Sequence, residues 1–326
     1  MPSDSYPFAV GRVKLLENGL LDRSKLARLN ELTLPEAVRA LSDWGYAADY
    51  PVKNDIDGMV AFRRRELRSV IDEVTPDKEL TDLFYLETDA TNFKLLLKYR
   101  MLGGYGFDHA DLQSGLFPID VVRNCVESRN YSELGEPLAE KLQDADEALR
   151  VSVNPRTLSA NVDNAFFAYI FTVLARKKNK FCTSYFRRKV DYINIISVLR
   201  SRALHWDKSE FEPMIVPGGT ISRETLLYSV ECEQENLAPT LAPSWNGEEV
   251  EERDTDQVRA AIDLCHSGSL EDARAALAAK LDDMAERRRF DSFGIGPIVC
   301  FLLAGENECR ALRVLFAKKR AAQQKA

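Results

Sequence analysis

Apolar side chains recur at three- and four-residue intervals along most of this chain, and that spacing constrains its fold more than any other feature. Over residues 161–175 the spacing forms one broad apolar stripe, and residues 270–284 repeat it with alanine, leucine and charged residues. Helix starts are also marked, because Thr33, Pro35 and Glu36 have the arrangement of a capping box. Alternating strand patterns are almost absent. The sequence therefore predicts an all-α fold.

Glycine and proline divide this helical pattern into blocks at residues 49–51, 103–106, 213–219 and 239–247. The glycines at 103–106 superficially resemble a phosphate-binding loop. Such loops follow a strand, whereas these glycines follow a helix, so we interpret them as its glycine stop. The turn at 217–219 has no Lys-Ser or Lys-Thr pair after it and is predicted to join two helices.

Charge and cysteine content bear on the class of partner. The formal net charge is -7, which disfavours nucleic acid as a ligand because phosphate binding calls for a basic face. Basic clusters at 63–65, 176–178 and 287–289 lie in helix-like stretches, and we interpret them as solvated helical faces. The six cysteines form no C-x-x-C pair and are predicted to be small buried residues in a reducing compartment.

A polar pattern recurs after about a hundred residues. Asp89 stands three residues before Asn92, and Asp191 stands three residues before Asn194. In both copies a Leu follows the Asn by five residues, basic residues follow by six and eight, and a Phe precedes the Asp by five. A weaker third copy contains Asn307, with alanine in the place of the Asp. Because the interval is much longer than that of solenoid repeats, the sequence predicts three similar helical lobes.

The spacing of the pattern leaves two roles open for its polar residues, which share one side of a helix. They either satisfy backbone groups and fix the helix against its neighbours, or present equivalent polar faces to a central partner. In the second case we expect Lys98, Arg200 and Arg313 to face a cavity and meet acidic groups. The candidate residues of the motif are Asp89, Asn92, Lys94, Lys98, Arg100, Asp191, Asn194, Arg200, Arg202, Asn307, Arg310 and Arg313.

The order of these motifs along the chain resembles one family throughout. The segments that carry the resemblance are Asp89-x-x-Asn92-x-Lys94, residues 186–194 with Leu199-Arg200, residues 214–219, residues 294–297, and residues 304–308 with Leu312-Arg313. Together they resemble the C subunit of the V-type and archaeal-type (A-type) ATPases, which is equivalent to the eukaryotic d subunit of the AC39 family. Two positions depart from the pattern, because Gly296 stands where a Glu is expected before the Pro and Ile196 stands at the place of Lys94.

The resemblance implies an all-α, funnel-like molecule of three pseudo-symmetric lobes around a central cavity. It implies one domain over residues 1–326, with motif segments at 84–102, 186–202 and 297–315. Such a protein is a non-catalytic socket that couples the central shaft, formed by the D and F subunits, to the membrane proteolipid ring. It transmits torque for proton or sodium transport. The alternative is a cytoplasmic helical scaffold or adaptor with no rotary role.

No catalytic, cofactor-binding or metal-ligating residue is predicted. The three histidines are far apart and show no H-x-x-x-H or H-E-x-x-H pattern. No uninterrupted run of about 18 apolar residues is present, and the N-terminus lacks the features of a signal peptide. We therefore expect a cytoplasmic protein that is peripheral on the inner face of a membrane, with membrane contact only through the complex. No small-molecule substrate is expected.

Overall fold

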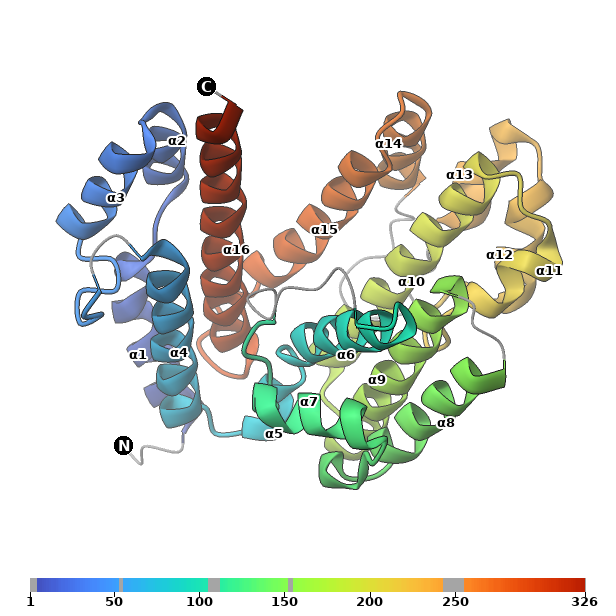
Figure 1. The fold of residues 1–326 in the computed structure, drawn as a ribbon, viewed down its shortest axis with the longest axis horizontal. Helices are drawn as coiled ribbons and strands as arrows, with labels where there is room; N and C mark the ends of the chain where they lie inside the picture. Colours follow the sequence, from blue (N-terminus) through green and yellow to red (C-terminus); the bar gives the residue numbers. More distant parts are fainter. Residues whose placement is uncertain (1–4, 53–54, 105–111, 152–154, 243–254, 326) are drawn as a thin grey trace. The chain divides into compact units, whose positions relative to one another are not determined.

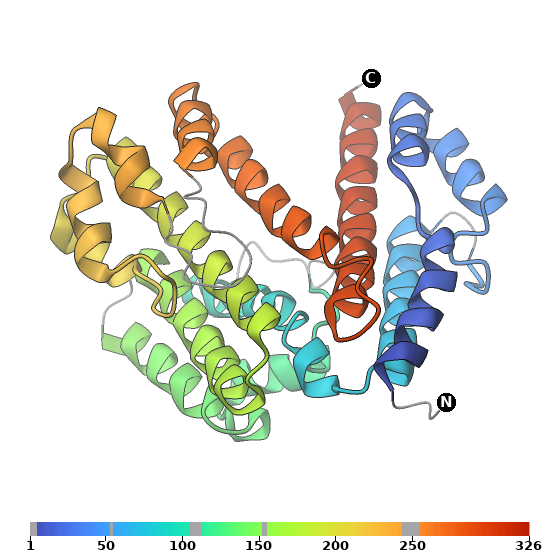
Figure 2. The ribbon, with the colours of Figure 1, turned by 180° about the vertical axis from the view of Figure 1, so that it is seen from behind.

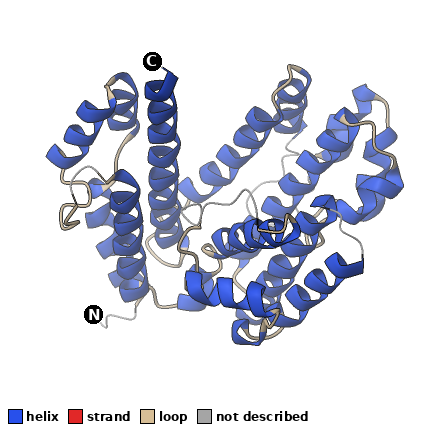
Figure 3. Ribbon diagram, viewed as in Figure 1, coloured by secondary structure: helices blue, strands red, loops and turns tan. Residues whose placement is uncertain are grey.

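The computed structural model describes residues 5–52, 55–104, 112–151, 155–242 and 255–325. Within these ranges the chain forms helices and loops without a strand (Figure 3), which confirms the all-α prediction. The α-helices are α1 (Tyr6–Leu16), α2 (Arg23–Glu31), α3 (Leu34–Asp43), α4 (Ile56–Val74), α5 (Lys78–Asp82), α6 (Leu86–Met101), α7 (Ile119–Ser128), α8 (Leu138–Val151), α9 (Pro155–Lys177), α10 (Lys180–Ala203), α11 (Lys208–Phe211), α12 (Arg223–Glu231), α13 (Gln234–Leu241), α14 (Thr255–His266), α15 (Leu270–Glu286) and α16 (Gly296–Lys325). Short 3₁₀ helices are η1 (Glu17–Gly19), η3 (Ser132–Leu134) and η4 (Glu212–Met214).

The chain forms two compact units. The first comprises Met1–Thr81 and Ala285–Ala326, so it contains both ends of the chain, and the second comprises Asp82–Met284. In the first unit the C-terminal helix α16 lies beside α4 and also contacts α1, α2 and α3 (Figure 1). Leu29, Leu41, Leu312 and Phe316 are fully buried in its core. The two ends of the sequence therefore build one hydrophobic core.

The second unit is built around the long helix α9, which contacts α6, α8, α10 and η4 (Figure 2). Residues 157–177 of α9 are long and apolar enough to cross a membrane by length and composition alone. Half of the apolar window is nevertheless buried inside the protein, and the core helix of a soluble protein passes the same test. Phe166 packs on Phe93 of α6 with ring centroids 5.8 Å apart. We interpret α9 as the core helix of this unit.

Local signals in the sequence set several helix boundaries. Thr33 and Glu36 form the predicted capping box at the start of α3. Ser269 accepts a hydrogen bond from the backbone N–H of Asp272 at the start of α15. Gly104 has a φ of 88° and donates its N–H to the carbonyl of Tyr99, which confirms that the glycines here end α6. Residues 105–111, including the last glycine of this cluster, lie outside the described residues.

The basic clusters are not all solvated helical faces. Arg64 in α4 is buried, and its Nε donates to Glu306 Oε1 of α16 at 2.8 Å. Helix α15 ends at Glu286, so residues 287–289 lie in the turn after it instead of on a helix. The prediction was wrong in these two cases because a charge run on its own does not show which carboxylates the fold brings to it.

Candidate functional site

The first copy of the polar motif fixes a loop to its own helix. Asp89 in α6 accepts hydrogen bonds from the backbone N–H groups of Leu116 (2.7 Å) and Phe117 (3.3 Å). Asn92 exchanges two hydrogen bonds with the backbone of Gln113, donating from Nδ2 to its carbonyl at 2.7 Å and accepting from its N–H at 3.1 Å. Both side chains are buried. The backbone N–H and C=O groups of the loop before α7 therefore have side chains of α6 as hydrogen-bond partners, where regular secondary structure would supply backbone partners.

The second copy makes the same contacts. Asp191 in α10 accepts from the N–H of Thr220 (2.7 Å), from its hydroxyl (2.7 Å) and from the N–H of Ile221 (3.0 Å). Asn194 donates to the carbonyl of Val216 at 2.8 Å and accepts from its N–H at 2.9 Å. Burial raises the pKa of Asp191, although the hydrogen bonds from Thr220 and Ile221 oppose that shift. We call this arrangement the Asp/Asn clamp.

A glycine completes each clamp. Gly115 lies against Asp89 and Gly219 lies against Asp191, and a Cβ built on either glycine falls less than 3.0 Å from the carboxylate oxygen. Any side chain at these two positions therefore displaces the loop from the carboxylate. Glycine is needed here because the loop backbone approaches the carboxylate closely. The backbone conformation does not call for glycine, since neither residue has a positive φ.

The basic residue eight positions after each Asn holds the end of the helix that follows the clamped loop. Arg100 donates from Nη1 to the carbonyl of Val126 in the last turn of α7 at 2.6 Å, and it pairs with Asp146. Arg202 donates from Nη1 to the carbonyls of Ser229 (3.0 Å) and Val230 (3.1 Å) at the end of α12. Carbonyls at the end of a helix lack intrahelical partners and carry partial negative charge, so a guanidinium stabilises them.

Equivalent contacts in the first unit come from Glu308 and Lys319 of α16. Glu308 accepts from the N–H of Leu21, in the loop before α2. Lys319 donates to the carbonyls of Asn30 (3.0 Å) and Leu32 at the end of α2. Glu308 and Lys319 are eleven residues apart, the same separation as between the acid and the Arg in each of the other two copies. Burial raises the pKa of Glu308.

The sequence comparison did not find this third set of contacts. It aligned Asn307 with the Asn of the other copies, but Asn307 accepts a hydrogen bond from Arg310 of its own helix at 3.4 Å. In the alignment that the contacts define, Glu308 replaces the Asp and Ala311 replaces the Asn. The Asp-x-x-Asn signature is therefore absent from α16, and only the spacing from the acid to the distal basic residue survives.

The remaining candidate residues fall into two groups. Lys94 pairs with Asp163 of α9 inside the second unit. Lys98 and Arg200 are exposed and Arg313 is half-buried, and none of the three has a hydrogen bond or ion pair with another described residue. Partial desolvation and the nearby charge of Arg274 lower the pKa of Arg200. These three cations are thus the motif residues that the internal structure does not use.

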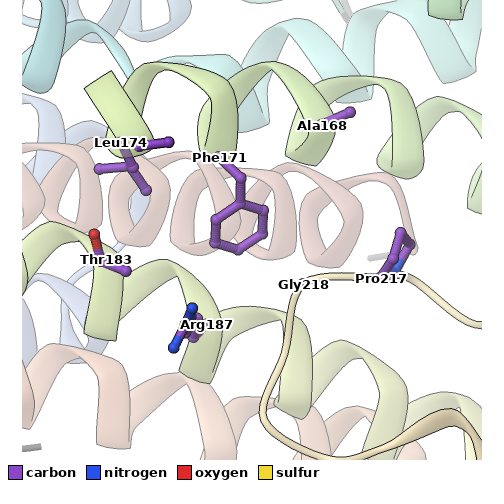
Figure 4. A pocket seen from close by; sticks show the side chains of 8 residues that line it. Ala168, Phe171, Leu174, Thr183, Arg187, Pro217 and Gly218 are labelled. Atoms are coloured by element: carbon purple, nitrogen blue, oxygen red, sulfur yellow. The ribbon is translucent and has the colours of Figure 1, made fainter. Parts of the chain in front are cut away.

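A recess of about 480 Å³ opens beside the second clamp, between α9, α10 and the loop at 217–218 (Figure 4). Phe171 from α9 lies against Gly218, while Thr183 and Arg187 of α10 form the polar part of its lining. Its described lining holds no acid, histidine or cysteine. Across the described ranges no three His, Cys, Asp or Glu side chains come together as metal ligands. All six cysteines are free thiols, five of them buried and Cys265 half-buried.

Comparison with known proteins adds to this geometry. The family model described as ATP synthase (C/AC39) subunit matches residues 9–325. The chain is 24% identical over 334 residues to the A-type ATP synthase C subunit of Thermococcus onnurineus, covering 95% of this chain and 85% of that protein. It is 24% identical over 338 residues to the A-type ATP synthase C subunit of Methanosphaera stadtmanae, covering 97% and 84%. It is 21% identical over 266 residues to the V-type sodium ATPase C subunit of Enterococcus hirae, covering 82% and 78%.

Proposed function

The chain belongs to the ATP synthase (C/AC39) subunit family, and from that premise we propose that it is the rotor component that couples the shaft of the D and F subunits to the membrane proteolipid ring. It takes no part in ATP chemistry itself and transmits torque for proton or sodium transport. It acts at the cytoplasmic face of the membrane. The observation that carries this proposal is the family match over nearly the whole chain, with relatives named as the C subunit of A-type and V-type complexes.

The clamps suit a part that transmits torque. A coupling component must resist deformation, because any bending under load stores the energy that it is meant to pass on. Close-packed helices supply stiffness, and buried hydrogen bonds fix the connecting loops to them. Asp191 and Asn194 tie one loop to α10 at two points, and Arg202 ties the following helix to the same α10. Loop and helix are thereby joined to one rigid element.

The motif residues that the clamps leave unused are the candidates for contact with the shaft. Lys98 and Arg200 stand six positions after the Asn of their clamps, and Arg313 stands six positions after Asn307, which takes no part in the third set of contacts. We propose that the three lobes surround a cavity, and that these cations face it and meet acidic groups of the shaft. Complementary charge at such an interface increases the association rate and fixes the orientation of the partner.

Binding measurements test this proposal directly. The purified chain is immobilised and exposed to the D–F shaft complex and, separately, to the detergent-solubilised proteolipid ring. Capture of both, together in one ternary complex, supports the coupling role. Capture of neither by a folded, helical chain overturns it and leaves the helical scaffold as the better account.

A charge-reversal variant tests the residues. The triple variant K98E/R200E/R313E is expected to lose affinity for the shaft by tenfold or more, since close charge pairs across an interface contribute about 1.5–7 kcal/mol. It should retain ring binding and the helical circular dichroism of the unaltered chain. If shaft affinity is unchanged, these three cations do not form the interface.

A matched control separates this effect from net charge. Arg28, Arg39 and Lys141 are likewise exposed and have no ion pair with a described residue. The variant R28E/R39E/K141E therefore changes the net charge by the same amount at unrelated positions. It is expected to bind the shaft like the unaltered chain at physiological ionic strength, where distant charges are screened.

A further inference from the structure

Three large apolar side chains in the first unit are more exposed than any other described in the chain. They are Phe290 (80% exposed), Phe293 (74%) and Leu15 (72%). Phe290 and Phe293 stand in the turn between α15 and α16, and Leu15 stands near the end of α1. The two segments touch, because the ammonium of Lys14 lies 4.8 Å from the centroid of the Phe290 ring.

Two cations lie over the ring of Phe290, the most exposed of these side chains. The guanidinium of Arg289 lies 5.8 Å from the centroid of the Phe290 ring, on which Lys14 also sits. The nearby carboxylates are already paired, with Glu17 accepting from Lys14 at 3.1 Å and from Arg289 at 3.2 Å. Asp291 accepts from Arg288 at 3.4 Å. The carboxylates of this region therefore do not present free negative charge.

The same two segments of the chain carry further positive charge that is unpaired. Arg12 in α1 and Arg287 in the turn are exposed and have no ion pair with a described residue. Cations thus exceed carboxylates in this region, although the chain as a whole has a net charge of -7. We call Arg12, Lys14, Leu15 and the turn at residues 287–293 the basic–aromatic patch.

This combination fits a phospholipid surface better than a protein partner. The core of a protein interface is depleted of charged residues, lysine among them, although arginine is enriched there. In the basic–aromatic patch a lysine, Lys14, lies together with Arg289 over the Phe290 ring itself. At the boundary between headgroups and acyl chains, a phenylalanine ring can enter the apolar layer while neighbouring Lys and Arg remain with the phosphates. Anionic lipids attract basic residues within a Debye length of the membrane.

We propose that the basic–aromatic patch binds an anionic bilayer surface, with Phe290 and Phe293 entering the headgroup boundary and Arg287 bound to lipid phosphate. This goes beyond the proposed coupling role, in which membrane contact passes only through the proteolipid ring. It also stands apart from that role, because it rests on the exposed side chains and needs neither the shaft nor the ring.

Cosedimentation of the full-length chain with vesicles tests the proposal. Vesicles of phosphatidylcholine are compared with vesicles that also contain phosphatidylglycerol, at low and at high salt. The chain is expected to bind the anionic vesicles, and high salt is expected to weaken that binding. Binding to both kinds of vesicle with equal affinity, or to neither, overturns the proposal.

Two variants locate the contact. F290A/F293A is expected to lower the partition coefficient onto anionic vesicles about tenfold or more, because each ring loses apolar area that the membrane buries. R287E is expected to lower the same partition coefficient about fivefold or more, because one basic residue near an anionic surface contributes about that factor to binding. The matched controls are L204A/Y228A, at exposed apolar positions of the second unit, and R39E. Control variants that lose as much binding place the contact elsewhere and overturn the assignment.

A direct probe of insertion separates a lipid surface from a protein partner. F290W is expected to show a blue-shifted emission difference spectrum on addition of anionic vesicles, after subtraction of the spectrum of the unaltered chain. No shift with vesicles, together with loss of ring capture in F290A/F293A, assigns the patch to a protein interface and overturns the lipid proposal. Loss of shaft and ring binding with intact vesicle binding contradicts only the coupling role.

Discussion

Replacing Asp191 tests whether the Asp/Asn clamp works through hydrogen bonds. D191A leaves the N–H groups of Thr220 and Ile221 and the hydroxyl of Thr220 without their acceptor. Thr220 and Ile221 are half-buried, so each unsatisfied group costs about 1 kcal/mol, the lower end of the range for a buried group. The buried carboxylate is also destabilising, because burial disfavours its charged form and raises the pKa of Asp191. D191A removes this destabilising contribution as well. We therefore expect the free energy of unfolding to fall by about 3 kcal/mol, because the lost hydrogen bonds outweigh the relief of that burial.

D191N is the informative comparison. Both backbone N–H groups donate to Oδ1, and the Thr220 hydroxyl contacts Oδ2. An asparagine can keep its oxygen at the first position and donate from its nitrogen to the hydroxyl oxygen at the second. All three hydrogen bonds then survive without a buried charge. We expect D191N to remain within about 1 kcal/mol of the unaltered chain.

The pH dependence provides a second readout. Because burial raises the folded-state pKa of Asp191 above its unfolded value, protonation of this group favours the folded state. That contribution is fully present below the unfolded carboxyl pKa, and it is lost as the pH rises through the raised folded-state pKa. D191N has no such titration, so its stability relative to the unaltered chain is expected to increase with pH across this window.

Urea unfolding followed by circular dichroism measures these changes, and hydrogen exchange localises them. In D191A the amides of Thr220 and Ile221 are expected to exchange about a hundredfold faster, the factor that corresponds to about 3 kcal/mol. If D191N is destabilised as much as D191A, the negative charge holds the loop and the hydrogen-bond account is refuted. If neither variant changes stability or exchange, the clamp does not fix the loop.

Three further substitutions follow from the same contacts. G218A is expected to lower stability by about 2 kcal/mol in thermal unfolding, because φ is +106° there and a Cβ would collide with the Phe171 ring. R202K should cost about 1 kcal/mol, since one ammonium cannot reach the carbonyls that the guanidinium serves; unchanged urea unfolding would contradict this. E308A should cost about 3 kcal/mol and speed exchange at the amide of Leu21, and unaltered exchange there would show that the third set of contacts is not structural.

Signals that act within one helix turn were readable from the sequence. The capping box at Thr33 and the glycine stop at Gly104 depend on residues a few positions apart, so their geometry follows from local backbone preferences. The Asp-x-x-Asn spacing likewise marked two helices that use these residues identically. Its structural role at Asp89 and Asp191 required the structure, because the loops that they bind lie more than twenty residues away.

The third set of contacts was hidden by the order of the chain. In the first two copies the loop follows the motif helix, whereas Glu308 at the C-terminal end binds a loop near the N-terminus. The motif itself is also changed there, because Glu308 and Ala311 stand in the places of the Asp and the Asn. The pairing of Arg64 with Glu306 was likewise invisible, since the fold alone brings residues this far apart into contact.

Ion transport in a rebuilt complex tests whether this chain couples the shaft to the ring. The rotary ATPase is reconstituted into vesicles with and without the chain, and ATP hydrolysis and ATP-driven ion uptake are measured on the same samples. We expect that omission abolishes ion uptake while the catalytic head still hydrolyses ATP, and that adding the chain restores uptake. Ion uptake at the full rate without the chain would contradict the coupling role.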